Sequence, residues 1–177
     1  QQTELVREPV DVNGLVENTI SIVKNQALIK GVSLKYERTD GLPRITLDRS
    51  QMESVLLNII LNALDATDSG GSITVTAGIG MSADRDRLKG VEIICRDTGC
   101  GIPPEIKHKL FEPYFSTKKS GTGLGLAIVN TIISDHNGYI RIRDNDPRGT
   151  RFIIELPSHV DEAAGYLDLE NPQQKRR

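Results

Sequence analysis

The sequence predicts an α+β fold, in which a mixed and mostly antiparallel sheet is covered on one face by helices to give a two-layer α/β sandwich. Three observations support this prediction. Segments with alternating apolar residues, which are typical of strands, outnumber segments with helical spacing. Two of the predicted strands follow each other across a charged loop, as in a hairpin. The elements also lack the regular alternation of strand and helix that builds a parallel sheet.

The first half of the chain predicts two helices with two short strands between them. Apolar residues recur at helical spacing behind a potential N-cap at Asp11, and Gly31 ends that pattern. Alternating apolar residues, interrupted by Gly41 and Pro43, indicate the strands. In chain order we expect a helix over 12–27, strands over 32–36 and 45–48, and a long helix from Ser50 to Ala66.

The second half predicts four strands and two helices around one long segment. Residues that break regular structure recur between Asp97 and Gly125, so we expect a long mobile segment there, with a lid from Gly99 to Gly125. The strands over 73–77 and 91–96 should pair as a hairpin. The remaining expected elements are a short helix from Pro104 to Leu110, a helix from Leu124 to Asp135, and strands over 139–143 and 151–156.

The composition excludes several classes of function. A net charge of -2, an isoelectric point near 6.0 and 4% aromatic residues provide neither a basic field nor a stacking platform for nucleic acid. Apolar runs fall short of the ~20 residues that span a bilayer. Cys95 and Cys100 lack metal-site spacing, and Gln1 begins no secretory signal. We therefore expect a cytoplasmic domain with no nucleic-acid partner.

We expect the long predicted helix to be buried almost all round, and its polar stripe suggests a metal site. At 100° per residue, its polar residues fall within an arc of about 80°: Gln51, Ser54, Asn58, Asn62 and Asp65. A solvated helix face is the competing interpretation, but such faces usually carry Lys, Arg and Glu. Amide oxygens are hard neutral ligands that suit Mg²⁺, so the stripe should face a cavity and Asn62 is the first metal candidate.

A second motif follows the strand over 91–96 and runs from Asp97 to Pro103 with the sequence DTGCGIP. A carboxylate at a strand end can accept a hydrogen bond from an exocyclic amine, and glycines let the backbone approach a planar ring, as adenine recognition requires. A tight turn built from Asp and Gly is an equally good interpretation. The spacing does not fit a calcium-binding EF-hand loop.

A third motif, the glycine-rich stretch from Gly121 to Ile128, runs directly into a predicted helix. Free N–H groups and the positive end of the helix dipole favour anions there, and phosphate is the natural ligand. Lys118 and Lys119 add positive charge upstream. Helix packing could also explain the glycines, and surface lysine pairs are common.

Together these motifs resemble the Bergerat ATP-binding fold of histidine kinases, gyrase-like ATPases, ninety-kilodalton heat-shock chaperones and mismatch-repair ATPases. The segments NIILNALDA, DTGCGIP, LFEPYFST and GTGLGL look like the N, G1, F and G2 boxes, in order. The resemblance covers roughly residues 9–157, so we expect a catalytic ATP-binding domain over 1–157 and a polar, disordered tail over 158–177.

The residue at the first N-box position assigns the chain to one branch. The hydrolysing branches carry Glu there, which activates water, whereas this chain has Asn58. Asn58 and the F-box residues Phe111 and Phe115 resemble histidine kinases, and the F and G2 boxes are similar to nitrogen-regulation sensor kinases. A serine kinase of the anti-sigma type, which usually carries Glu at that position, and a module that senses nucleotide without transfer are the alternatives.

The resemblance implies a set of ATP-binding residues. Asn62 would ligate Mg²⁺, Asn58 would support the phosphates or the metal, and Asp97 would bind the adenine amino group with Thr150 in support. Phe111 and Phe115 would anchor the lid. The full expected set is Asn58, Asn62, Asp65, Asp97, Gly99, Gly101, Ile102, Phe111, Phe115, Thr117, Lys118, Lys119, Gly121, Thr122, Gly123, Leu124, Gly125, Leu126 and Thr150.

Two features depart from the family pattern. Asp65 stands near a point where other histidine kinases often carry Lys or Arg, and Lys118 is the candidate for compensating its charge. The phosphoacceptor is missing, because the H box is a His followed by an acidic residue on a dimerisation helix. His108 lies in the lid, His136 at a helix C-terminus, where a cation complements the dipole, and His159 in the tail.

The missing phosphoacceptor suggests a fragment of a longer kinase, and the first residue, Gln1, agrees with this. We expect a monomeric catalytic domain of a two-component, homodimeric parent. The acceptor histidine would lie on the parent's dimerisation domain, and a response regulator would be an indirect partner. The parent could be anchored in the inner membrane, and the fragment alone should turn over little.

Overall fold

The computed structural model describes residues 4–81, 89–116 and 125–158. Its elements in chain order are β1 (Glu8–Val10), α1 (Val12–Lys30), β2 (Ser33–Glu37), β3 (Ile45–Leu47), α2 (Arg49–Ala66), β4 (Ser72–Met81), β5 (Lys89–Asp97), α3 (Pro104–Lys107), α4 (Gly125–Asp135), β6 (Tyr139–Asp144) and β7 (Thr150–Pro157). Among the described helices, none has the length and apolar character needed to cross a membrane.

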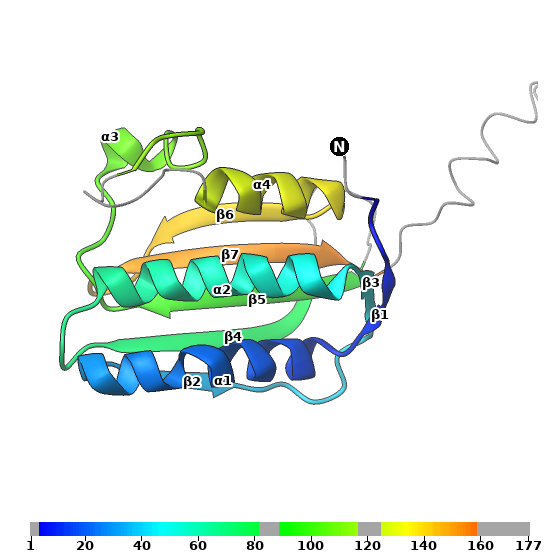
Figure 1. Cartoon of the computed structure of the whole chain (residues 1–177), viewed down its shortest axis with the longest axis horizontal. Coiled ribbons are helices and arrows are strands. Elements are labelled where there is room, and N and C mark those ends of the chain that lie inside the picture. The colour runs from blue at the N-terminus through cyan, green and yellow to red at the C-terminus, as the bar shows by residue number, and fades with distance from the viewer. Residues whose placement is uncertain (1–3, 82–88, 117–124, 159–177) are drawn as a thin grey trace, which may run out of the picture.

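The main sheet has five strands in the order β2-β4-β5-β7-β6. Only β2 and β4 pair in parallel, while the other neighbours are antiparallel, including the predicted β4–β5 hairpin. Helices α1, α2 and α4 lie side by side over one face of this sheet (Figure 1). The predicted two-layer sandwich with a mixed, mostly antiparallel sheet is therefore confirmed.

A second, two-stranded sheet pairs β1 with β3 in antiparallel register. Strand β1 was not predicted from the sequence, because three residues that include Pro9 show no alternation long enough to detect. Its strand conformation depends on pairing with β3, a partner far away in the sequence.

The predicted helix ends are close to the observed ones. Asp11 caps α1 by accepting a hydrogen bond from the Asn13 N–H at 3.2 Å, and Gly31 ends the helix in the left-handed conformation. Asp48 caps α2 through its Oδ1, which accepts from the Gln51 N–H at 3.1 Å. Because Asp48 is the cap, α2 begins one residue before the predicted Ser50.

The core lies between the sheet and the three helices, with α2 between α1 and α4 (Figure 1). One broad stripe of α2 is buried: Met52, Val55, Leu56, Ile59, Ile60, Ala63 and Leu64. We expected α2 to be buried almost all round, but Leu57 and Leu61 are only partly buried. Each fully buried aliphatic side chain contributes roughly 1.5–3 kcal/mol, so this contact holds α2 firmly in place.

His136 does not act as the expected helix-terminal cation. It is buried at the end of α4, and its Nδ1 lies 2.7 Å from the Ile132 carbonyl oxygen while its Nε2 accepts from the Asp48 N–H at 3.0 Å. A ring with one donating and one accepting nitrogen is neutral. The expectation was wrong because α4 packs its C-terminal end against the start of α2. His108 is exposed, and His159 lies outside the described residues.

Candidate functional site

Asp97 stands at the end of β5 with its carboxylate fixed by the backbone. The residue is 2% exposed, and its Oδ1 accepts hydrogen bonds from the Gly99 N–H at 2.9 Å and the Thr150 N–H at 3.2 Å. Burial raises the pKa of this carboxyl group, and the two N–H donors oppose that rise. The predicted neighbours Asp97 and Thr150 therefore meet, and the contact uses the threonine backbone.

The turn between β6 and β7 braces the backbone of Asp97 from the other side. Asn145 Nδ2 donates to the Asp97 carbonyl oxygen at 2.8 Å. Gly149 has a φ of +101°, and a Cβ built there would lie 1.9 Å from the same oxygen. This close approach was not predicted from the sequence. The Gly149–Thr150 pair directly before a strand was the available signal.

The loop after Asp97 packs against the C-terminal end of α2. The Cys100 N–H donates to the Ala66 carbonyl oxygen at 3.1 Å, and a Cβ on Gly99 would lie 2.4 Å from that oxygen. Gly99 is thus required by packing within the protein. Among the described residues, a Cβ on Gly101, which has a φ of +75°, would meet only the Gly149 oxygen within 4 Å, at 3.7 Å, so within this part of the chain the glycine borders open space.

The same loop shows that the two interpretations of DTGCGIP are compatible. The bond from the Gly99 N–H to the Asp97 carboxylate, two residues back, is the turn-forming bond of an Asx turn. This turn also fixes the direction of the carboxylate. It places Gly99 and Cys100 in the fixed wall of the site, although we predicted a lid that begins at Gly99.

The polar stripe of α2 lies beside the start of α4. Asn58 Nδ2 donates to the Ser54 carbonyl oxygen at 3.0 Å, and a Cβ on Gly125 would lie 2.9 Å from Asn58 Oδ1. A glycine at position 125 therefore lets the first turn of α4 approach this amide. Asn62 is partly buried on the same stripe, and Asp65 is exposed at its end.

A lysine from α1 completes the C-terminal end of α2. Lys30 Nζ donates to the carbonyl oxygens of Leu64 and Asp65 at 2.6 and 3.3 Å. A cation complements the negative end of a helix dipole. Within the described residues, the site is therefore built from the ends of three elements, α2, β5 and β7, and from the first turn of α4.

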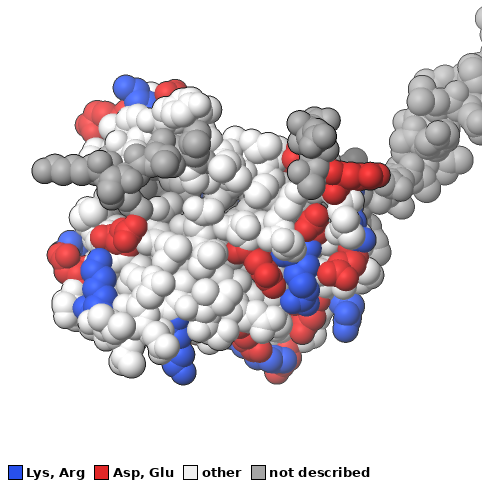
Figure 2. Space-filling model, in the orientation of Figure 1, with Lys and Arg blue, Asp and Glu red and all other residues white. Residues whose placement is uncertain are grey.

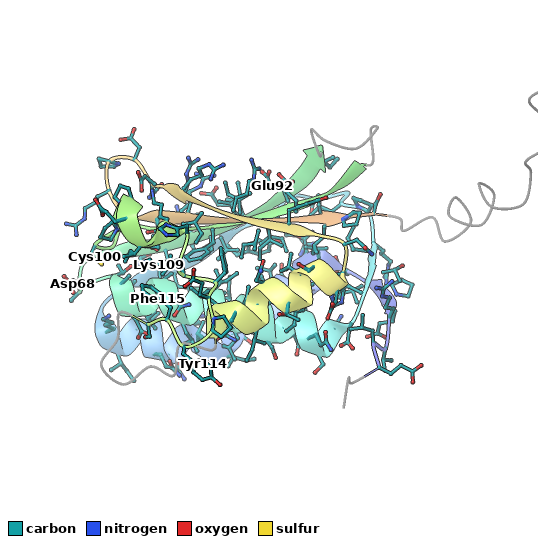
Figure 3. The ribbon with its side chains drawn as sticks, turned by 90° about the horizontal axis from the view of Figure 1, so that it is seen from above. Asp68, Glu92, Cys100, Lys109, Tyr114 and Phe115 are labelled. Atoms are coloured by element: carbon teal, nitrogen blue, oxygen red, sulfur yellow. The ribbon has the colours of Figure 1, made fainter. Side chains whose placement is uncertain are left out.

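The segment from Pro103 to Ser116 borders the site with little burial. Leu110 and Phe111 pack against the core, Phe115 is partly buried, and Tyr114 beside it is 80% exposed (Figure 3). The predicted anchors Phe111 and Phe115 thus lie at the rim. Seven predicted residues lie outside the described part of the chain: Thr117, Lys118, Lys119, Gly121, Thr122, Gly123 and Leu124. Leu126, by contrast, packs on the core.

The chemistry of the described site fits a polyphosphate with a sparsely liganded cation. Few charged side chains lie across the centre of the helix-covered face (Figure 2). Among the described residues, no cluster of three or more His, Cys, Asp or Glu side chains could hold a metal ion. Mg²⁺ prefers a few protein oxygens together with substrate phosphates and water, so the amides of the α2 stripe suit it.

Comparison with known proteins places this geometry in a family. Residues 47–160 match the family described as histidine kinase-, DNA gyrase B- and HSP90-like ATPase. The sensor histidine kinase ZraS of Escherichia coli O157:H7 is 36% identical over 158 residues, which are 89% of this chain and 33% of that protein. Sporulation kinase E of Bacillus subtilis is 33% identical over 153 residues, which are 86% of this chain and 20% of that protein.

Solved structures agree with the sequence matches. The catalytic domain of histidine kinase ThkA, 30% identical, superposes with a TM-score of 0.74 over 88% of this chain and 97% of that domain. Full-length ShkA in complex with AMPPNP, 29% identical, superposes with a TM-score of 0.76 over 89% of this chain and 32% of ShkA. The chain spans about a third of the length of the ZraS sequences.

Proposed function

Because this chain belongs to the histidine kinase-, DNA gyrase B- and HSP90-like ATPase family, as the catalytic domain of a bacterial sensor histidine kinase, we propose that it binds Mg·ATP and donates the γ-phosphoryl group to a histidine on a separate domain. In this transfer the bond between the γ-phosphorus and the β,γ-bridging oxygen breaks, a bond from phosphorus to the imidazole nitrogen forms, and ADP leaves.

The observation that carries this proposal is the fixed carboxylate of Asp97. Its Oδ1 is held by two backbone N–H groups, and the residue is buried, so the carboxylate is set in advance to accept a hydrogen bond from the adenine amino group. Gly101, beside open space, would border the ring, and Ile102, which packs against the core, would support it. The full-length ShkA structure, with AMPPNP bound, supports an adenine nucleotide as the ligand of this fold.

The phosphates would lie toward the α2 stripe and the start of α4. The close approach of Gly125 to Asn58 brings the N-terminal end of α4, with its free N–H groups, next to the amide stripe. Asn62, with Asn58 in support, would hold Mg²⁺, which supplies charge neutralisation when bound. Thr117, Lys118, Lys119 and the glycines of the G2 box stay candidates for further phosphate contacts.

The acceptor histidine would come from another domain of the parent kinase. His136 is buried and engaged through both ring nitrogens, and His108 lies on the exposed rim in no H-box sequence. The dimerisation domain is therefore the proposed direct partner, and a response regulator the downstream one. One similar solved structure is the complex of histidine kinase ThkA with the response regulator protein TrrA. We place the domain in the cytoplasm, where ATP is available.

A reconstituted transfer reaction tests this proposal. The chain is incubated with γ-labelled ATP, Mg²⁺ and a separately prepared dimerisation domain of the same parent. We expect label on the second protein in a bond that is stable to base and labile to acid, as a phosphoramidate is. An acid-stable phosphoserine product would favour the serine kinase alternative, and nucleotide binding with no transfer under any condition would favour a sensing module.

A further inference from the structure

The face of the sheet that the helices leave uncovered carries a row of three arginines. Side chains alternate along a strand, so Arg96 lies on the same face of β5 as Glu92, which points away from the helices (Figure 3). Arg96 is directly opposite Arg151 on β7, and Arg151 is directly opposite Arg143 on β6. We call Arg96, Arg151 and Arg143 the arginine row.

The positive charge of the arginine row is not balanced by neighbouring carboxylates among the described residues. Like charges that face each other across strands destabilise a sheet. Other cations on this face are paired, Lys35 with Glu37 at 3.6 Å and Arg141 with Glu155. Within the described residues, the three arginines of the row form no salt bridge. Arg143 Nη1 and Arg151 Nε donate to the backbone carbonyl oxygens of Ile142 and Asp144 at 2.9 and 3.1 Å, which leaves their positive charge unpaired, and Arg96 Nε is buried without a hydrogen-bond partner. The row therefore has donors and charge to offer to an anionic ligand.

The shape of the charge pattern favours a single extended acidic segment. The next row of side chains toward the other end of the sheet contains Ile94 and Ile153, and the row after it contains Glu92 opposite Glu155. A broad anionic surface such as a membrane would meet those two glutamates as well as the arginines. A narrow strand of carboxylates can follow the row alone, and guanidinium groups bind carboxylates in a two-pronged geometry.

We propose that the arginine row docks the acidic stretch of this chain around Asp168 and Glu170. Residues 161–170 contain Asp161, Glu162, Asp168 and Glu170 and no Lys or Arg, and they follow the end of the family match at residue 160. The stretch continues from β7, the strand that also carries Arg151. This arrangement would add an intramolecular contact directly behind the site, because Asp97 and Thr150 are the chain neighbours of Arg96 and Arg151.

The connecting chain has a suitable length. Arg151 lies six residues back along β7 from Pro157, a span of about 20 Å at ~3.4 Å per residue. Asp168 follows Ser158 by ten residues, for which the random-coil relation gives a root-mean-square reach of roughly 18 Å, so the span and the reach match. Asp161 follows Ser158 by three residues, or about 10 Å at full extension, and its backbone falls short of the row.

Nuclear magnetic resonance on the full chain tests the proposal. The Nε–Hε resonances of the three arginines should differ between about 0.05 M and about 1 M salt, because the Debye length falls to ~3 Å at 1 M and the contact is lost. Asp168→Asn with Glu170→Gln should give, already at low salt, the high-salt spectrum of the row. Asp161→Asn with Glu162→Gln, a matched change of two charges outside reach, should keep the low-salt spectrum.

A second pair of variants changes the arginines and measures the effect on the acidic stretch. Arg143→Gln with Arg151→Gln should raise the backbone mobility of residues 164–172 in ¹⁵N relaxation, and Lys35→Gln with Arg141→Gln should not. Unchanged row resonances in the Asp168/Glu170 variant would overturn the proposal. Row resonances that move on addition of phosphatidylserine vesicles, with no response to the Asp168/Glu170 variant, would assign the row to a lipid surface and overturn it equally.

Discussion

The two ends of the candidate site are built in different ways. At the proposed adenine end, Asp97 and the loop after it are held by contacts from distant parts of the chain, namely Ala66 at the end of α2 and the β6–β7 turn at Asn145 and Thr150. Along the segment from Pro103 to Ser116, no residue is buried, and backbone N–H groups such as those of Ile106, Glu112 and Phe115 donate to carbonyls three residues back.

This difference in construction would give the two ends separate roles, one in selecting the nucleotide base and the other in closing over the phosphates. The loop after Asp97 is fixed by contacts between residues far apart in the sequence, so it opens only when a large part of the fold opens. It can therefore hold the Asp97 carboxylate in one fixed direction. A segment held by local bonds, by the packing of Leu110 and Phe111 and by the exposed Lys107–Asp144 ion pair can change its conformation at little cost. The proposed adenine end would therefore select the base. The segment from Pro103 to Ser116, here called the rim segment, would change its conformation when the phosphates bind.

Hydrogen exchange should show the largest contrast between the two ends. In the nucleotide-free protein we expect the amides of Thr98, Gly99 and Cys100 to exchange at least about a hundredfold more slowly than those of Ile106, Glu112 and Phe115. A Mg·ATP analogue should slow exchange in the rim segment, and ADP should slow it less, because the γ-phosphate is absent. Equal protection at both ends, or equal protection in all three states, would contradict the comparison.

Gly149→Ala should lower the free energy of unfolding more than the matched substitution Gly101→Ala. Its Cβ would lie 1.9 Å from the Asp97 carbonyl oxygen, at a φ of +101°. Steric overlap and strain should lower the free energy of unfolding by more than about 3 kcal/mol. Gly101→Ala is the matched control, because its φ is +75° but its nearest contact is at 3.7 Å, and it should cost about 1–2 kcal/mol. Urea unfolding with similar m-values would measure both, and comparable losses would refute the close approach.

Asp97→Asn should reduce ATP affinity by about 10- to 100-fold, as expected for a lost hydrogen bond to a charged group of about 1.5–3 kcal/mol. It should also remove most of the preference for ATP over GTP. Calorimetry with both nucleotides measures this effect. Asp68→Asn, an equal change of charge at an exposed position near the end of α2, serves as the control. A preserved preference for ATP in the Asp97 variant would show that another group recognises the base.

Asn62→Ala should lower Mg·ATP affinity by about fivefold, in line with the loss of one polar contact of roughly 1 kcal/mol. The loss should shrink when Mg²⁺ is chelated, because the amide is proposed to act on the metal. Ser54→Ala changes an exposed residue of the same stripe and should have little effect. Equal losses with and without Mg²⁺ would place Asn62 outside the metal site, and transfer to the dimerisation domain should fall in parallel with affinity.

The pH dependence of stability should show the smallest effect. Burial raises the pKa of Asp97 in the folded state, so this carboxyl group favours folding most below its unfolded pKa and loses that contribution as pH rises through its folded pKa. The amide introduced by Asp97→Asn could still accept both backbone hydrogen bonds, and it cannot ionise. Relative to the unsubstituted chain, this variant should therefore gain stability as pH rises above the ordinary titration range of an Asp carboxyl group. A constant difference across this range would argue against the raised pKa.

The parts of the molecule that could be predicted are those whose structure depends on residues close together in the sequence. The caps at Asp11 and Gly31, the hairpin of β4 and β5 and the length of α2 follow from spacing and local conformation, and the structure confirms them. The three residues of β1 carried no such signal, and the neutral state of His136 depends on the Asp48 N–H, which lies 88 residues away in the chain.

The sequence by itself determined the family, the order of the boxes and the choice of candidate site residues, because those features are local patterns of side chains. Only the tertiary structure decided which of the glycines serve packing and which border open space. Gly99 meets Ala66, Gly149 meets Asp97 and Gly125 meets Asn58, each across a contact between separate elements. The physical reason is that a glycine leaves space where other residues have a Cβ, and the sequence does not show which atoms come close to that space. Only the fold determines which backbone or side-chain amide approaches it.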